Sequence, residues 1–235
     1  MPNRYIPYLK VLIHLLCLAP LFFLYQWYRS GQMATNADPV NYITHFTGNW
    51  ALWILIASLA VTPLRRLHAK LSNLVRFRRL IGLYAFVYAT LHLATYVFLY
   101  SGYDLTTALT GLRAGHPGEV VTQWKAVWPS MVEDVLKRRF IQVGLFSWVI
   151  LLALAVTSPL PVLRRMGGKN WQRLHRLVYV AAIAGCIHYW WIVKSGVRTP
   201  LPDSIVLTLL LLARLVWSVW NQRRKSALKQ AGATA

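Results

Sequence analysis

Acidic residues and cysteines are scarce in this chain. Only 6 of its 235 residues are Asp or Glu, against 26 Lys or Arg, which gives a formal net charge of +20. So few carboxylates leave a carboxylate-coupled proton relay almost without donors or acceptors. The 2 cysteines, Cys17 and Cys186, both lie in apolar runs. We therefore interpret them as small buried hydrophobic residues and not as a disulfide or a nucleophile.

Several common functional patterns are missing as well. The sequence has no Gly-rich phosphate loop, no GxSxG elbow and no CxxC pair, and we expect no internal repeat. Its positive charge alone would suggest a nucleic-acid binder. However, 57% of the residues are hydrophobic, above the roughly 45–50% of a soluble domain. This composition excludes a disordered basic tail, a disulfide scaffold and an ordinary soluble enzyme.

Long apolar runs are what the sequence does contain. A helix needs about 20 residues to cross the ~30 Å hydrocarbon layer, and six runs approach or reach that length. They predict an all-α fold, an integral membrane six-helix bundle, with a single domain over residues 1–235. The first run lacks a small-residue cleavage site, so we interpret it as a retained helix. The expected helices cover residues 10–29, 49–64, 79–101, 140–161, 172–194 and 203–222.

Lys and Arg are distributed unevenly among the connections. Most of them lie at the two termini and in the connections that follow the second and fourth predicted helices. Because basic loops remain on the cytoplasmic side of a membrane, we expect both termini in the cytoplasm. The longest connection, residues 102–139, then lies outside, and we expect it to hold a short helix or two.

Two histidines, His92 and His188, lie deep in apolar runs, where an ionisable group is costly and indicates function. His92 comes 13 residues after Arg79, and His188 comes 13 residues after His175. At ~1.5 Å per residue, both lie about 20 Å from the inner boundary. Two imidazoles at one depth on different helices predict an axial pair for haem iron. Two unrelated buried polar residues, or a proton or ion relay, are the alternatives.

A second haem is left open by the sequence. His175 is its candidate ligand near the inner surface, but the matching positions on the third helix are Arg78 and Arg79, which cannot bind iron. His14 on the first helix is the substitute ligand. Arg78 and Arg79 are explained either by orientation alone or by pairing with haem propionates or a flavin phosphate. The other histidines are expected to be merely solvated: His45, His68 and His116.

Six stretches, taken together, resemble one known family. They are HFTGNWAL (His45 to Leu52), VTPLRR (Val61 to Arg66), RRLIGLYAFVYATLHLATY (Arg78 to Tyr96), KRRFIQVG (Lys137 to Gly144), VTSPL (Val156 to Leu160) and WQRLHRLVYVAAIAGCIHYWWIVK (Trp171 to Lys194). In order and spacing they resemble the MsrQ (YedZ) family, within the ferric-reductase-like transmembrane superfamily. These are haem-binding membrane subunits of the bacterial periplasmic protein-methionine-sulfoxide reductase system.

The resemblance implies a multi-pass protein of the bacterial inner membrane that binds haem b, with FMN as a second cofactor. The family's haem histidines match His92, His175 and His188. Electrons are expected to come from a cytoplasmic flavin reductase or quinol and to pass to a periplasmic molybdopterin methionine-sulfoxide reductase. The chain would then be an electron-transfer subunit and not the catalytic one. Its outer connection, roughly residues 106–135, is longer than the family pattern.

Two other functions remain open from the sequence. The first is a membrane ferric reductase or quinol-oxidising cytochrome b with a different acceptor. The second is a haem-free transporter whose buried histidines carry protons.

Overall fold

The computed structural model describes residues 5–67, 69–194, 196 and 198–233. Every regular element within these ranges is helical, which confirms the all-α prediction. The longer helices are α1 (Ile6–Arg29), α2 (Pro39–Leu67), α3 (Arg78–Thr95), α5 (Gly118–Lys137), α6 (Arg139–Val156), α9 (Val178–Ile192) and α10 (Leu201–Ala233). The shorter ones are η2 (Gln32–Thr35), η3 (Ala69–Arg76), η4 (Tyr96–Tyr100), α4 (Leu105–Arg113), α7 (Leu160–Met166) and α8 (Gly168–His175).

Five of these helical segments are long and apolar enough to cross a membrane, among the described residues. They are Ile6–Arg29, Pro39–Arg66, Arg78–Tyr100, Arg139–Val156 and Leu201–Ser226. They correspond to five of the six predicted spans, so the chain is a multi-pass membrane protein. The predicted helix 172–194 is instead divided into α8 and α9, and α9 alone has 15 residues.

Several helix boundaries differ from the predictions. The helix α2 begins at Pro39 and not at residue 49, because Asp38 accepts a hydrogen bond from the Asn41 amide at 2.9 Å and proline suits the first helical position. The helix α6 ends at Val156, five residues early, just before a segment that contains Pro159. The last helix runs on to Ala233, well beyond residue 222.

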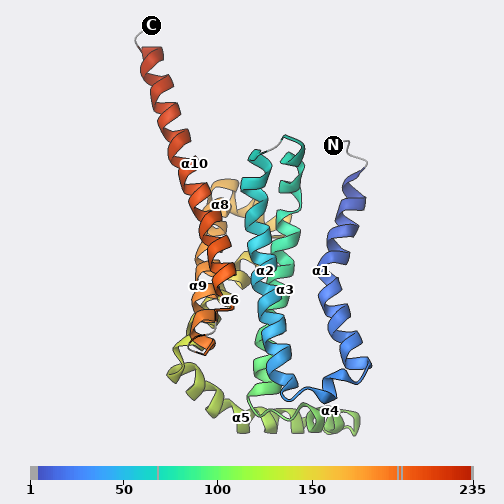
Figure 1. The fold of residues 1–235 in the computed structure, drawn as a ribbon. Helices are drawn as coiled ribbons and strands as arrows, with labels where there is room; N and C mark the ends of the chain where they lie inside the picture. The colour runs from blue at the N-terminus through green and yellow to red at the C-terminus, as the bar shows by residue number, and fades with distance from the viewer. Residues whose placement is uncertain (1–4, 68, 195, 197, 234–235) are drawn as a thin grey trace.

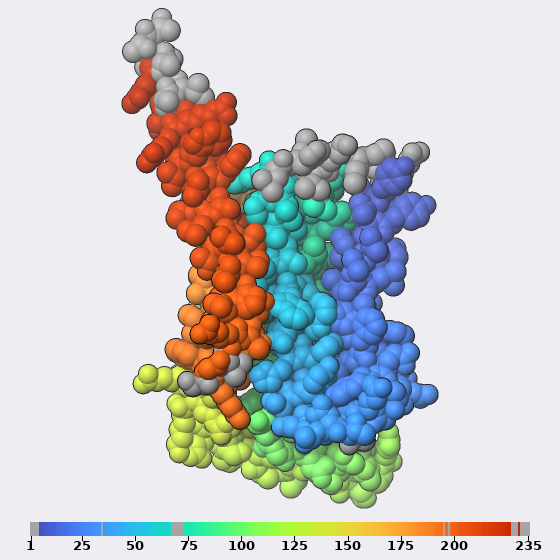
Figure 2. All heavy atoms as spheres, in the orientation of Figure 1, coloured from blue at the N-terminus to red at the C-terminus, as the bar shows by residue number. Residues whose placement is uncertain are grey.

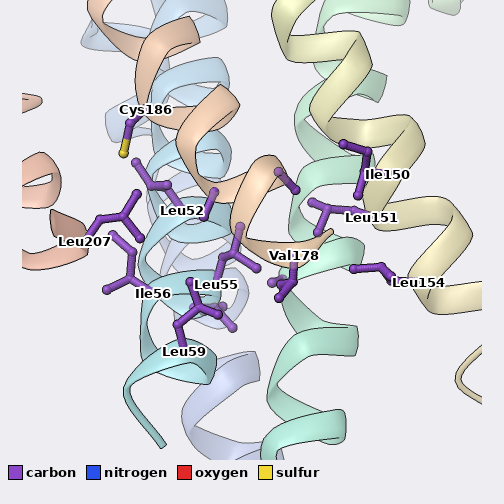
Figure 3. Close-up of a cluster of buried hydrophobic side chains, with 14 of the residues drawn as sticks. Leu52, Leu55, Ile56, Leu59, Ile150, Leu151, Leu154, Val178, Cys186 and Leu207 are labelled. Carbon is purple, nitrogen blue, oxygen red and sulfur yellow. The ribbon is translucent and has the colours of Figure 1, made fainter. Parts of the chain in front are cut away.

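The core lies among α2, α3, α6, α9 and α10 (Figure 3). Leu52, Leu55, Ile56 and Leu59 of α2 pack with side chains of α6, α9 and α10. The helix α1 lies to one side of this group (Figure 1). It is held to α3 by the buried Tyr88, whose hydroxyl donates to the Cys17 carbonyl at 2.7 Å. The four-helix core formed by α2, α3, α6 and α9 therefore provides the frame for the buried histidines.

The two ends of the bundle differ. The predicted outer connection forms α4 and α5, which lie across the end of the bundle opposite the chain termini (Figures 1 and 2). The start of α1, the end of α10 and the basic segments around η3 and α8 lie at the other end (Figure 1). The strongly basic connections and both termini thus share one end, as the distribution of Lys and Arg predicts.

Candidate haem site

The His92 and His188 side chains meet inside the bundle. Their ring centroids lie 5.9 Å apart, and the two ring planes are inclined at 81°. His92 comes from α3 and His188 from α9. The equal depth inferred from the sequence therefore does bring these two rings together.

Each ring is oriented by a main-chain carbonyl on a neighbouring helix. The Nδ1 atom of His92 lies 2.9 Å from the Thr44 carbonyl oxygen of α2, and Nδ1 of His188 lies 2.7 Å from the Phe140 carbonyl oxygen of α6. A carbonyl oxygen only accepts, so each Nδ1 carries the proton. Both Nε2 atoms consequently have a free lone pair, which is the form that binds a metal.

A glycine lies against each of these rings. A Cβ atom on Gly48 would come within 3.1 Å of the His92 ring, and one on Gly144 would come within 2.6 Å of Nδ1 of His188. Any larger residue would push the ring away from its carbonyl partner. Glycine at these two positions therefore creates the space that the histidines occupy.

The two halves of the site have the same local arrangement. Thr44, Gly48 and His92 of the pair α2–α3 correspond to Phe140, Gly144 and His188 of the pair α6–α9. Every member of the second set lies 96 positions after its counterpart. Sequence reasoning missed the carbonyl and glycine positions, although this shared spacing of two glycines and two histidines was a readable signal.

The geometry fits an iron held between two imidazoles. With metal–nitrogen bonds of about 2.0–2.1 Å, two axial imidazole rings have centroids roughly 6 Å apart. The observed 5.9 Å agrees with this value. Within the described ranges, no group of three or more His, Cys, Asp or Glu side chains could hold a bare metal ion. The pair thus suits an iron whose remaining ligands come from a porphyrin.

His175 lies at the end of α8, in a different environment. Its ring stacks on Trp171 with centroids 3.8 Å apart, and its Nε2 atom lies 3.2 Å from the Thr157 hydroxyl oxygen. That hydroxyl donates to the Ala153 carbonyl, so it accepts from Nε2–H of His175 and leaves Nδ1 with the lone pair. Burial, with smaller contributions from the charges of two arginines, lowers the pKa of His175 to about 4. The ring is therefore neutral at pH 7.

The arginines that act on His175 are Arg78 and Arg79, at the start of α3. The substitute ligand His14 is exposed on α1, with Nδ1 2.6 Å from the Tyr84 hydroxyl oxygen. Among the described side-chain contacts, His14 and His175 have no partner in common. The structure does not join them into a second pair, and their roles stay predictions.

Of the remaining histidines, only His45 lies close enough to act electrostatically on both rings of the pair, among the described residues. His116 is exposed, as expected, in the turn between α4 and α5. His45 is half-buried on α2, next to the carbonyl partner of His92. The expectation for His68 concerns a position outside the described residues.

Comparison with known proteins agrees with the quoted motifs. The family model described as "Ferric reductase like transmembrane component" matches residues 47–186. A protein of Xanthomonas axonopodis pv. citri is 40% identical over 217 residues, which cover 91% of this chain and 86% of that protein. A protein of Xanthomonas oryzae pv. oryzae is 40% identical over 94% of this chain and 92% of its own length. A protein of Herminiimonas arsenicoxydans is 39% identical over 81% of this chain and 77% of its own length. All three are named "Protein-methionine-sulfoxide reductase heme-binding subunit MsrQ".

Proposed function

Because the chain belongs to the MsrQ family of haem-binding subunits, we propose that it carries electrons to a periplasmic methionine-sulfoxide reductase. It is a membrane electron-transfer protein of the bacterial inner membrane. The electrons would come from a cytoplasmic flavin reductase or from quinol. The acceptor would be the molybdopterin-containing catalytic subunit, which repairs oxidised periplasmic proteins.

The observation that carries this proposal is the His92–His188 pair, with both Nδ1 atoms bound to carbonyls. The two Nε2 atoms would hold the iron of one haem b. This haem supplies the ferric–ferrous couple, which accepts and releases single electrons. The carbonyls keep the rings oriented, the glycines give them room, and the apolar core excludes water from the site.

With His92 and His188 both holding the iron, no coordination position would stay open on it. Such a site favours electron transfer over oxygen binding or substrate chemistry. This supports a role as an electron-transfer subunit, with the catalytic step on another chain.

The topology completes the proposal. We assign α9 as the sixth span, since it packs against α6 in the core and connects to α10. Both termini would lie in the cytoplasm, because the basic connections share their end of the bundle. The His92–His188 site then lies in the outer half of the bilayer, toward the periplasmic acceptor.

A second redox site would lie at the inner end. His175, neutral and fixed by Thr157, is its proposed ligand for a second haem, with His14 as the proposed second ligand. Arg78 and Arg79 would pair with haem propionates or with the phosphate of FMN. Electrons would then enter near His175 and leave from the outer haem.

A second candidate function is a membrane ferric reductase, because the matching family model carries that description over residues 47–186. It would use the same haem and differ in its acceptor. Adding the purified periplasmic reductase with a methionine-sulfoxide substrate separates the two. We expect the reduced haem to be reoxidised only when both are present, whereas a ferric reductase is reoxidised by chelated ferric iron alone.

The haem assignment is tested on protein purified in detergent. We expect a reducible, low-spin b-type spectrum that is lost in His92→Ala and in His188→Ala. His116→Ala, which changes an exposed histidine, is the control and keeps the spectrum. A colourless but folded wild-type protein would contradict the proposal, as would full haem content in either site variant. His175→Ala should lower the haem-to-protein ratio or slow reduction from the cytoplasmic side.

A further inference from the structure

Arg214 lies near the middle of the last span, where charged residues are rare and usually functional. Its Nη2 atom donates to the Leu59 carbonyl of α2 at 2.5 Å, and its Nη1 atom donates to the Tyr179 hydroxyl of α9. Its guanidinium carbon also lies 5.0 Å from the centroid of the Tyr179 ring. The Arg214 side chain thus joins α10 to both α2 and α9.

Part of this arrangement has a structural cause in α2. Pro63 lies inside the helix, four residues after Leu59. Proline has no amide hydrogen, so the Leu59 carbonyl lacks its normal helical donor. Arg214 supplies that donor. A neutral amide side chain could do the same, so the hydrogen bond alone does not explain a charged group here.

The charge of Arg214 has no acidic partner. The ion pairs found among the described residues are Lys137–Glu133 and Arg138–Asp134, both at the outer end. The charged groups that act on Arg214 include Arg66 and Arg78, which are cations themselves. Its Nε atom is buried and, within the described part of the chain, makes no hydrogen bond. A costly charge is therefore kept in the bundle with no acidic counter-ion among the residues that the structure describes.

The position of Arg214 lies between the two proposed redox sites. Its partner Tyr179 is nine residues before His188 on α9, or about 13 Å along the helix axis. Its partner Leu59 is eleven residues after Gly48 on α2, or about 16 Å. Leu59 lies at the end of the core cluster opposite Cys186 (Figure 3). His175 precedes Tyr179 by only four residues.

We propose that Arg214 is a positioning residue whose positive charge stabilises the electron on the haem held by His92 and His188. This inference rests on the proposed function. Adding an electron makes the haem more negative, so a nearby cation favours the reduced state. At about 13–16 Å and an effective dielectric constant of about 20, the Coulomb energy changes the reduction equilibrium roughly 5- to 10-fold. That corresponds to about 40–60 mV for a one-electron couple.

The test is a potentiometric titration of the haem spectrum in the full-length protein. We expect R214Q to lower the midpoint potential by the stated amount while the haem-to-protein ratio and the low-spin spectrum are kept. R214K keeps the charge and should stay near the wild-type potential. R223Q is the matched control, because Arg223 is an exposed arginine nine residues further along the same helix. It should leave the potential unchanged.

A structural role would give a different pattern. If R214Q and R223Q have the same potential, or if R214K falls as far as R214Q, the charge is not the cause and the inference is overturned. Should R214Q fail to fold, P63A/R214Q replaces it, compared with P63A alone, since alanine restores the donor for the Leu59 carbonyl. A wild-type protein without haem would instead overturn the proposed function, so the two failures are distinguishable.

Discussion

Replacing Gly144 with alanine would drive a methyl group into the His188 ring. The new Cβ atom would lie 2.6 Å from Nδ1 and 2.7 Å from Cε1, whereas ordinary contacts begin near 3.4 Å. The ring would have to move by about 0.8 Å, well beyond the roughly 0.2 Å tolerance of a metal–nitrogen bond. The same movement lengthens the 2.7 Å hydrogen bond to Phe140, worth about 1 kcal/mol. We therefore expect Gly144→Ala to lose most of its haem.

Two other glycines calibrate this prediction. At Gly48 the new Cβ atom would lie 3.1 Å from the His92 ring, so that ring needs to move only about 0.3 Å. Gly48→Ala should keep part of its haem. At Gly82 of α3 the Cβ atom would meet nothing within 4 Å, so Gly82→Ala should keep all of its haem and gain up to about 1 kcal/mol of helix stability.

The assay is the haem-to-protein ratio from the pyridine haemochromogen, together with the low-spin visible spectrum and thermal melting by circular dichroism. The expected order of haem content is Gly82→Ala, then Gly48→Ala, then Gly144→Ala. If Gly144→Ala retains full haem, an unaltered spectrum and the wild-type melting temperature, then the glycine does not make room for His188, and the reasoning about this site is refuted.

Three further predictions concern residues outside the His92–His188 pair. Tyr88→Phe removes a buried hydroxyl from the Cys17 carbonyl, so the melting temperature should fall by about 2–4 °C for a loss near 1 kcal/mol; an unchanged melting curve would contradict this. Thr157→Val removes the acceptor for Nε2–H of His175, so it should alter only the inner redox signal and leave the outer haem spectrum intact. The Thr107 backbone amide donates a hydrogen bond to the Asp104 carboxylate at the start of α4, which lowers the pKa of this carboxyl below its ordinary 3.8. The Asp104 cap of α4 therefore contributes its full stability above pH 3.8 and loses it as the pH falls through the lowered pKa. The protection of the Thr107 amide against hydrogen exchange, relative to its intrinsic rate at each pH, should fall there in the wild type and be low at all pH values in Asp104→Ala.

The common level of His92 and His188 could be predicted because it depends on helix depth, whereas the facing of their rings depends on contacts with α2 and α6. A membrane fixes the axial position of each helix, and counting from the inner boundary places both residues at one level. The observed ring separation of 5.9 Å confirms that they come together. The start of α2 could not be found in the same way, since residues 39–48 are polar and the helix there depends on Asp38 as a cap.

The division of the predicted helix 172–194 into α8 and α9 could not be predicted from hydropathy either. The residues between α8 and α9, Arg176 and Leu177, contain neither proline nor glycine, so the local sequence carries no break signal. The break places His175 on a separate short helix, where Trp171 and Thr157 orient its ring. His175 and His188 therefore do not share one continuous helix, so their spacing of 13 residues does not fix the angle between their side chains.

The shared spacing of 96 residues holds for the chemistry at one end of the bundle and not at the other. At the end where His92 and His188 lie, the pairs α2–α3 and α6–α9 contribute the same set: a carbonyl, a glycine one turn later and a histidine that fits against them. At the other end, the position of Arg79 corresponds by this spacing to that of His175, so α8 offers an imidazole and α3 a guanidinium. A guanidinium binds carboxylates or phosphates and cannot ligate iron. The symmetric pair of imidazoles is therefore confined to the end where His92 and His188 lie, and we expect the proposed cofactor near His175 to present an acidic group toward α3.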